Sequence, residues 1–140
     1  MESPDARRAE WTFTPAASSV PESRNLLRAF VAEGLSPEAL DVAALLLTEL
    51  TTNAVLHAAT PYQVSLELCG AVLRVGVSDR SEREAKIVVG RRPIQGGMGL
   101  RLLAQLASRW GIDETATEPA GRGKTVWFEV DEEGGSGSPG

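Results

Sequence analysis

The segment of residues 36–60 places the strongest constraint on the fold, because it predicts one long and mostly apolar helix. Ser36 is a good N-cap, and Pro37 suits the first helical position. We expect the helix to run to about Ala58, since Thr60-Pro61 forces the backbone into an extended conformation. An apolar strip follows the helical repeat at Leu46, Leu47, Leu50 and Ala54. A helix of this kind has to be covered by other elements of the protein.

Hydrophobic periodicity predicts the other elements. They are a strand at 11–15, a helix at 18–34, a hairpin at 62–79, a long loop at 80–97, a helix at 98–111, and strands at 110–119 and 124–130. Gly34 and Gly111 suit helix ends, Gly70-Ala71 can turn the hairpin, and Gly121 with Gly123 can turn the chain before the last strand. This order predicts an α/β fold, a two-layer α+β sandwich. Its sheet would be mixed and largely antiparallel, with three helices on one face.

The chain of 140 residues, with a hydrophobic fraction of 42%, indicates one domain with a real core. We expect a flexible N-terminus at 1–10, the domain at 11–131, and a disordered low-complexity tail at 132–140. The first residues contain no apolar signal region, and the apolar runs are shorter than the roughly 20 residues of a membrane span. These features predict a cytoplasmic protein without a membrane partner.

Charge and rare residue types exclude several functions. The net charge of −5 argues against direct nucleic-acid binding, which requires a basic surface. The single cysteine, Cys69, cannot form an intramolecular disulfide, and we expect it to be a small buried hydrophobic residue. The single histidine, His57, excludes a two-histidine metal site and makes zinc improbable. His57 falls inside the apolar strip and is therefore interpreted as a core histidine.

Two polar residues interrupt the long helix on one side. Glu49 and Asn53 lie about 40° apart around the helix axis and border its apolar strip. They can form the wall of a cleft. A solvated helix edge gives the same pattern, so this helix alone does not decide between the two interpretations.

Three further motifs are ambiguous when each is taken alone. Asp79 ends a predicted strand in VGVSDRS, where a carboxylate can either cap a turn or accept a hydrogen bond from a ligand. Gly97 and Gly99 lead into a helix, whose free N–H groups favour phosphate, although flexible glycines at a plain helix start fit equally well. Thr125 opens the last strand after a glycine turn, where its hydroxyl can hold a ligand or only follow the turn.

Taken together, these motifs resemble the ATP-binding superfamily of gyrase B, heat-shock chaperone ATPases, histidine kinases and mismatch-repair ATPases. TELTTNAVLHA resembles the N box, VSDRS a reduced G1 box, GGMGL the G2 box and GKT the last box. Within the superfamily the chain is most similar to the compact bacterial anti-sigma-factor serine/threonine kinases. The resemblance covers residues 11–131 and implies a Bergerat-type ATP-binding fold.

The resemblance implies a role for each matching residue. Asn53 would bind Mg²⁺ and so ATP, Glu49 would be the catalytic base, and Asp79 would receive the adenine amino group. The G2 box would approach the phosphates through Gly97, Met98, Gly99 and Leu100. Thr125 would support the network on the adenine side. Residues 80–96 would form a lid over ATP, in which Arg91 and Arg92 either meet phosphate charge or are solvated. One position departs from the G1 box, since Ser81 stands where the family has glycine.

The implied function is that of a protein serine/threonine kinase using ATP and Mg²⁺. It would act as an anti-sigma factor that phosphorylates an anti-sigma-factor antagonist, sequesters a sigma factor and forms a homodimer. The alternative is a non-catalytic nucleotide-binding module that works by partner switching. Glu49 favours the kinase. Ser81, which replaces the glycine of the G1 box, is also compatible with the non-catalytic module.

Overall fold

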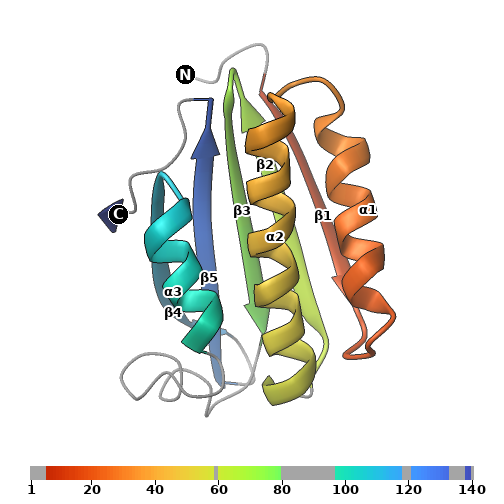
Figure 1. The fold of residues 1–140 in the computed structure, drawn as a ribbon. Helices are drawn as coiled ribbons and strands as arrows, with labels where there is room; N and C mark the ends of the chain where they lie inside the picture. Colours follow the sequence, from red (N-terminus) through yellow and green to blue (C-terminus); the bar gives the residue numbers. More distant parts are fainter. Residues whose placement is uncertain (1–5, 59, 80–96, 118–120, 133–137, 140) are drawn as a thin grey trace.

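A sheet and three α-helices form two layers in the described part of the chain (Figure 1). The computed structural model describes residues 6–58, 60–79, 97–117, 121–132 and 138–139. The elements are β1 (Arg7–Phe13), α1 (Ser19–Val31), α2 (Pro37–Asn53), the π-helical turn η1 (Ala54–Ala58), β2 (Tyr62–Cys69), β3 (Val72–Asp79), α3 (Gly97–Leu106), β4 (Arg109–Thr117), β5 (Gly121–Asp131) and β6 (Ser138–Pro139). The predicted α/β fold with three helices is confirmed, whereas η1 and β6 were not predicted.

The strands form one sheet in the order β1-β2-β3-β5-β4-β6. Each neighbouring pair from β1 to β4 is antiparallel, and β6 pairs with β4 in parallel over two residues. Gly70 turns the β2–β3 hairpin with φ of +62°, a backbone conformation that glycine adopts without strain. The chain passes through α3 between β3 and β4, and β5 then returns between these two strands.

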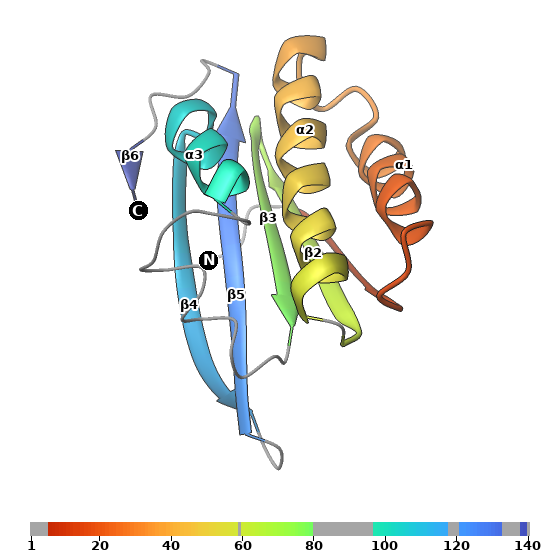
Figure 2. The ribbon, with the colours of Figure 1, turned by 60° about the horizontal axis from the view of Figure 1, so that its bottom comes forward.

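The core lies between the sheet and the helices, with α2 placed between α1 and α3 (Figure 2). Strand alternation directs every second side chain of β3 and β5 toward the helices. These inward residues are Leu73, Val75 and Val77 on β3, and Val126, Phe128 and Val130 on β5. The predicted strip is also buried, with Leu46, Leu47 and Leu50 on α2 and Ala54 at the start of η1. The apolar character of α2 is thus explained by its central position over β3 and β5.

One helical segment, Pro37–Leu56, is long and apolar enough to cross a membrane by length and composition alone. In the fold, this segment packs against the sheet, α1 and α3. Core helices pass the same test, so the segment supports no membrane assignment.

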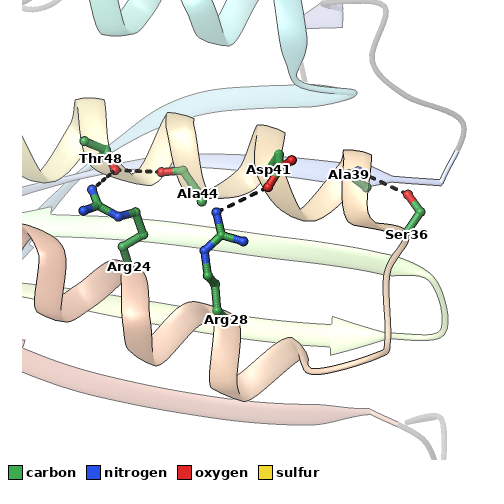
Figure 3. A network of polar contacts seen from close by, with 7 residues as sticks. All are labelled: Arg24, Arg28, Ser36, Ala39, Asp41, Ala44 and Thr48. Atoms are coloured by element: carbon green, nitrogen blue, oxygen red, sulfur yellow. Dashed lines mark hydrogen bonds and ion pairs between the residues drawn. The ribbon is translucent and has the colours of Figure 1, made fainter.

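Polar contacts join α1 to α2 (Figure 3). The Arg24 guanidinium donates to the Thr48 hydroxyl at 3.0 Å, and the Arg28 guanidinium forms an ion pair with Asp41 at 3.3 Å. The N-cap prediction for α2 is confirmed, because the Ser36 hydroxyl accepts a hydrogen bond from the Ala39 amide at 3.1 Å. The two arginine contacts thus connect the surfaces of α1 and α2.

The predicted end of the third helix was wrong. Helix α3 ends at Leu106, and Gly111 lies inside β4, directly opposite Trp127 of β5. A Cβ atom at position 111 would lie 2.7 Å from Cζ2 of the Trp127 indole. Gly111 is therefore required by cross-strand packing and does not end a helix.

Two further expectations are corrected by the strands. Gly121 and Gly123 do not form the turn, because β5 begins at Gly121 and both glycines pair with β4. Cys69 is exposed, whereas we expected it to be buried. Alternation explains this result, since Val64, Leu66 and Leu68 point to the core and the next residue points to the opposite face.

Candidate functional site

Four elements place one of their ends at the same end of the molecule. These are the C-terminal ends of α2 and β3 and the N-terminal ends of α3 and β5 (Figure 1). Helix α2 packs against α3, and β3 pairs with β5 in the middle of the sheet. This arrangement brings together segments that carry most of the residues predicted to bind a nucleotide.

Glu49 and Asn53 lie in the last part of α2, and both are partly exposed. They are four residues apart, so they lie one helical turn apart on the same side. Their neighbours Leu50 and Ala54 are only 5% and 4% exposed. The two polar side chains therefore border the core, as predicted. Because the α-helix gives way to the π-helical turn η1 directly after Asn53, this residue is the last one in the regular repeat.

His57 lies in η1, and its side chain is outside the described part of the structure. The expectation that it belongs to the core therefore stays a prediction. π-Helical turns occur frequently at functional sites, because the local widening of the helix changes which groups face outward.

Asp79 ends β3 with its side chain on the helix side of the sheet, and the residue is 7% exposed. Its cross-strand neighbours are Tyr62 on β2 and Lys124 on β5. The Lys124 ammonium lies 3.8 Å from the Asp79 carboxylate, and both side chains are almost completely buried. Lys124 was not among the predicted site residues. Its inward direction follows from the alternation with Val126, Phe128 and Val130, a signal that was present in the sequence.

Thr125 lies on the opposite face of the sheet from Asp79. Its hydroxyl forms a 2.7 Å hydrogen bond with the Ser78 hydroxyl, and this face carries no helix among the described residues. Thr125 lines a hollow there together with Ser65, Arg74 and Trp127. The sheet thus separates Thr125 from Asp79, so the two side chains cannot contact the same group of a ligand in this arrangement.

The glycine-containing motif forms the start of α3. Gly97, Met98, Gly99 and Leu100 are its first four residues, and their backbone N–H groups are the ones that a helix leaves without an intrahelical acceptor. Such a helix start attracts anions through these groups and through the helix dipole. The predicted lid, including Ser81, Arg91 and Arg92, lies outside the described residues.

The donor chemistry at the end of α2 suits a magnesium ion bound together with phosphate. No group of three His, Cys, Asp or Glu side chains able to hold a metal exists among the residues that the structure describes. Mg²⁺ does not require such a group, because it is usually held by one or two protein oxygens together with phosphates and water. The partly exposed Asn53 amide supplies an oxygen of this kind.

Comparison with known proteins agrees with this geometry. A search of curated proteins found no match. The family model of the histidine kinase-like ATPase domain matches residues 13–130, a range that runs from the end of β1 to the end of β5. Membership of this family implies ATP binding. Since the match covers all three helices and the centre of the sheet, the chain belongs to the histidine kinase-like ATPase domain family.

Proposed function

We propose that the protein is an ATP-dependent serine/threonine protein kinase that acts as an anti-sigma factor. It phosphorylates an anti-sigma-factor antagonist and holds a sigma factor inactive when that antagonist is modified. The ATPase family supports nucleotide binding, and the similarity of TELTTNAVLHA and GGMGL to the compact anti-sigma kinases supports the specific activity. A cytoplasmic location and a homodimer belong to the same proposal.

The observation that carries the proposal is the pairing of Glu49 with Asn53. The two side chains lie one turn apart at the end of α2, which is the end of the molecule where α3 begins. A plain solvated helix edge gives no reason for a carboxylate and an amide one turn apart at the end of the molecule where a glycine-containing helix begins. A phosphate group held by the first N–H groups of α3 supplies that reason.

Each residue then has a distinct chemical task. Asn53 would hold Mg²⁺, and the bound ion would supply positive charge that offsets the charge of the phosphates. Glu49 accepts the proton of a serine or threonine hydroxyl as that oxygen attacks the γ-phosphorus, and ADP leaves. Positioning and charge stabilisation provide most of the rate enhancement in phosphoryl transfer, so Glu49 mainly orients the hydroxyl.

Calorimetric titration with Mg·ATP tests the nucleotide site. We expect Asn53→Ala and Asp79→Asn to weaken binding by about tenfold or more, because each removes a hydrogen-bonded or metal-mediated contact worth roughly 1.5–3 kcal/mol. Asn25→Ala on exposed α1 and Asp113→Asn on exposed β4 are matched controls that should bind normally. Absence of binding by the wild type, or equal binding by all four variants, would sink the ATP-site assignment.

Phosphoryl transfer from labelled ATP to a candidate antagonist tests the kinase activity. We expect Glu49→Gln to keep its ATP affinity and to lose transfer by about 100-fold or more, the usual size of a general-base contribution. Glu38→Gln, in the exposed first turn of the same helix, should transfer at the wild-type rate. Transfer by Glu49→Gln at the rate of this control would remove Glu49 as the base.

The second candidate function is a non-catalytic nucleotide-binding module that works by partner switching. Ser81 favours it, because this residue stands where the G1 box of the family has glycine. This module predicts ATP binding together with undetectable transfer to any antagonist. The transfer experiment therefore distinguishes the two functions.

A further inference from the structure

The buried ion pair between Asp79 and Lys124 lies at the end of an apolar row of inward-facing residues. The two side chains are 6% and 7% exposed, and they face the helix layer from neighbouring strands. Taking two charges out of water costs several kcal/mol per ion, and an apolar pair of similar volume is often as stable or more so. The neighbouring inward positions are apolar, since Val77 and Val126 lie directly opposite each other. A charged pair at the end of this apolar row points to ligand recognition.

Both groups of the pair can contact more than one partner at a time. The Lys124 Nζ to Asp79 Oδ2 distance of 3.8 Å is longer than the roughly 2.7–2.9 Å of a charge-assisted hydrogen bond. An ammonium carries three N–H donors and a carboxylate about four acceptor sites, so each can serve a neighbour and a ligand at the same time. Any group that contacts the Asp79 carboxylate from the helix side therefore lies close to the Lys124 ammonium.

We propose that Lys124 recognises adenine together with Asp79. The inference rests on the proposed ATP site, in which Asp79 accepts a hydrogen bond from the N6 amino group. Adenine carries an acceptor, N1, directly beside this amino group. Lys124 donates a hydrogen bond to N1. The protein then presents an acceptor, Asp79, to the N6 amino group and a donor, Lys124, to N1.

This pair also distinguishes adenine from 6-oxopurines. Guanine and hypoxanthine carry a carbonyl oxygen at position 6 and an N–H group at position 1, which reverses the pattern. In the same orientation, the Asp79 carboxylate would meet the oxygen and the Lys124 ammonium would meet the N–H group. Unpaired buried polar groups make such a mismatch costly. Lys124 is therefore a specificity-determining residue.

Binding of base-modified nucleotides tests the proposal directly. We would titrate wild type and Lys124→Met with ATP, with 1-deaza-ATP, which replaces N1 by C–H, and with 7-deaza-ATP, which changes the other edge of the base. Wild type should bind 1-deaza-ATP about tenfold or more weakly than ATP, the effect of losing a hydrogen bond to a charged group, and should bind 7-deaza-ATP nearly as well as ATP. Lys124→Met should bind ATP and 1-deaza-ATP equally.

Substitution of Lys124 leaves the Asp79 charge buried, so folding of the variant has to be measured by circular dichroism. Lys124→Gln keeps a neutral donor and is the second variant. We expect its ratio of ATP affinity to 1-deaza-ATP affinity to lie between the ratios of wild type and Lys124→Met. If neither variant folds, the wild-type titrations decide: equal affinity for ATP and 1-deaza-ATP overturns the proposal, and selective loss with 1-deaza-ATP supports it.

The outcomes separate this inference from the proposed function. Failure of the wild type to bind ATP removes the nucleotide site and the inference together. If wild type and Lys124→Met both bind ATP and lose the same factor in affinity for 1-deaza-ATP, the role of Lys124 is overturned and the nucleotide site is not. Tighter ATP binding by Lys124→Met also overturns it, because the lysine would then compete with adenine for Asp79.

Discussion

At the scale of single residues, Tyr62 connects the helix layer to the sheet. Its hydroxyl forms a 2.5 Å hydrogen bond with Ser19 of α1, and its ring stacks on Phe13 with 5.5 Å between centroids. Burial raises the pKa of Tyr62 above its ordinary value of 10.0; the hydrogen bond with Ser19 lowers it and the Glu22 carboxylate raises it further. Tyr62 is also the cross-strand neighbour of Asp79, so its position supports the candidate site.

The raised pKa of Tyr62 predicts how stability depends on pH. The folded protein holds the phenol proton more tightly than the unfolded chain does. Tyr62 therefore contributes its full stability below pH 10.0, and this contribution is lost as the pH rises through the folded pKa. Since this is the only tyrosine of the chain, tyrosinate absorbance at 295 nm reports its ionisation directly. We expect the native midpoint to lie above the midpoint in denaturant.

The matched control for this prediction is Tyr62→Phe, which cannot ionise. At neutral pH it should be less stable than wild type by about 1 kcal/mol, the net value of the lost hydrogen bond to Ser19. This difference should shrink at alkaline pH, because only the wild type loses stability through Tyr62. Equal native and denatured titration midpoints would contradict the prediction.

Individual site residues could be predicted only in part from the sequence. Glu49, Asn53 and Asp79 carry local signals, a helical spacing and a strand end, and the structure places them at one end of the molecule. Thr125 and Lys124 are adjacent, and the GKT motif alone does not tell which one faces the helices. The alternation of the whole strand decides it, and the partner of Lys124 is a residue 45 positions earlier in the chain.

At the scale of elements, the types and order of the helices and strands could be predicted, whereas several of their ends could not. Periodicity within α2, β2 and β3 is local, so it is visible in the sequence. The end of α3 and the start of β5 depend on pairing between β4 and β5, which local signals do not encode. Gly111 illustrates this limit, because a glycine suits a helix end and a close cross-strand contact equally well.

The contact between β4 and β5 gives a testable consequence. Gly111→Ala would place a methyl group within 2.7–2.8 Å of the Trp127 indole, which is held on its other side by the Arg74 guanidinium at 4.0 Å. Overpacking of this kind costs about 1–3 kcal/mol. We expect urea unfolding to show this loss of stability.

The control for Gly111→Ala is Asp113→Ala, at an exposed position on the same face of β4. This change should alter the free energy of unfolding by less than about 0.5 kcal/mol. Equal stability of Gly111→Ala and wild type would show that the indole moves away without cost.

At the scale of the whole molecule, the candidate site depends on segments that are distant in sequence. α2, β3, α3 and β5 each contribute one end to it, and the core beneath them is a single cluster that includes residues of all three helices. A ligand bound by these ends is therefore sensitive to the packing of both layers. The same arrangement predicts that the edges of the sheet do not unfold separately.

Tryptophan fluorescence tests this cooperativity, because Trp11 lies in β1 and Trp110 in β4, on opposite sides of the central strands. Variants that keep Trp11 or Trp110 as the only tryptophan, with Trp127 also replaced, should show the same urea midpoint by fluorescence as by circular dichroism. Mg·ATP at about 100 times its dissociation constant should raise the stability reported by both tryptophans by about 2.7 kcal/mol, because it binds only the folded state. An increase in stability that is reported by Trp110 but not by Trp11 would show that β1 and α1 unfold independently of the site. An equal rise means that ATP binding stabilises the helix layer and the sheet as one unit, which a site built from α2, β3, α3 and β5 requires.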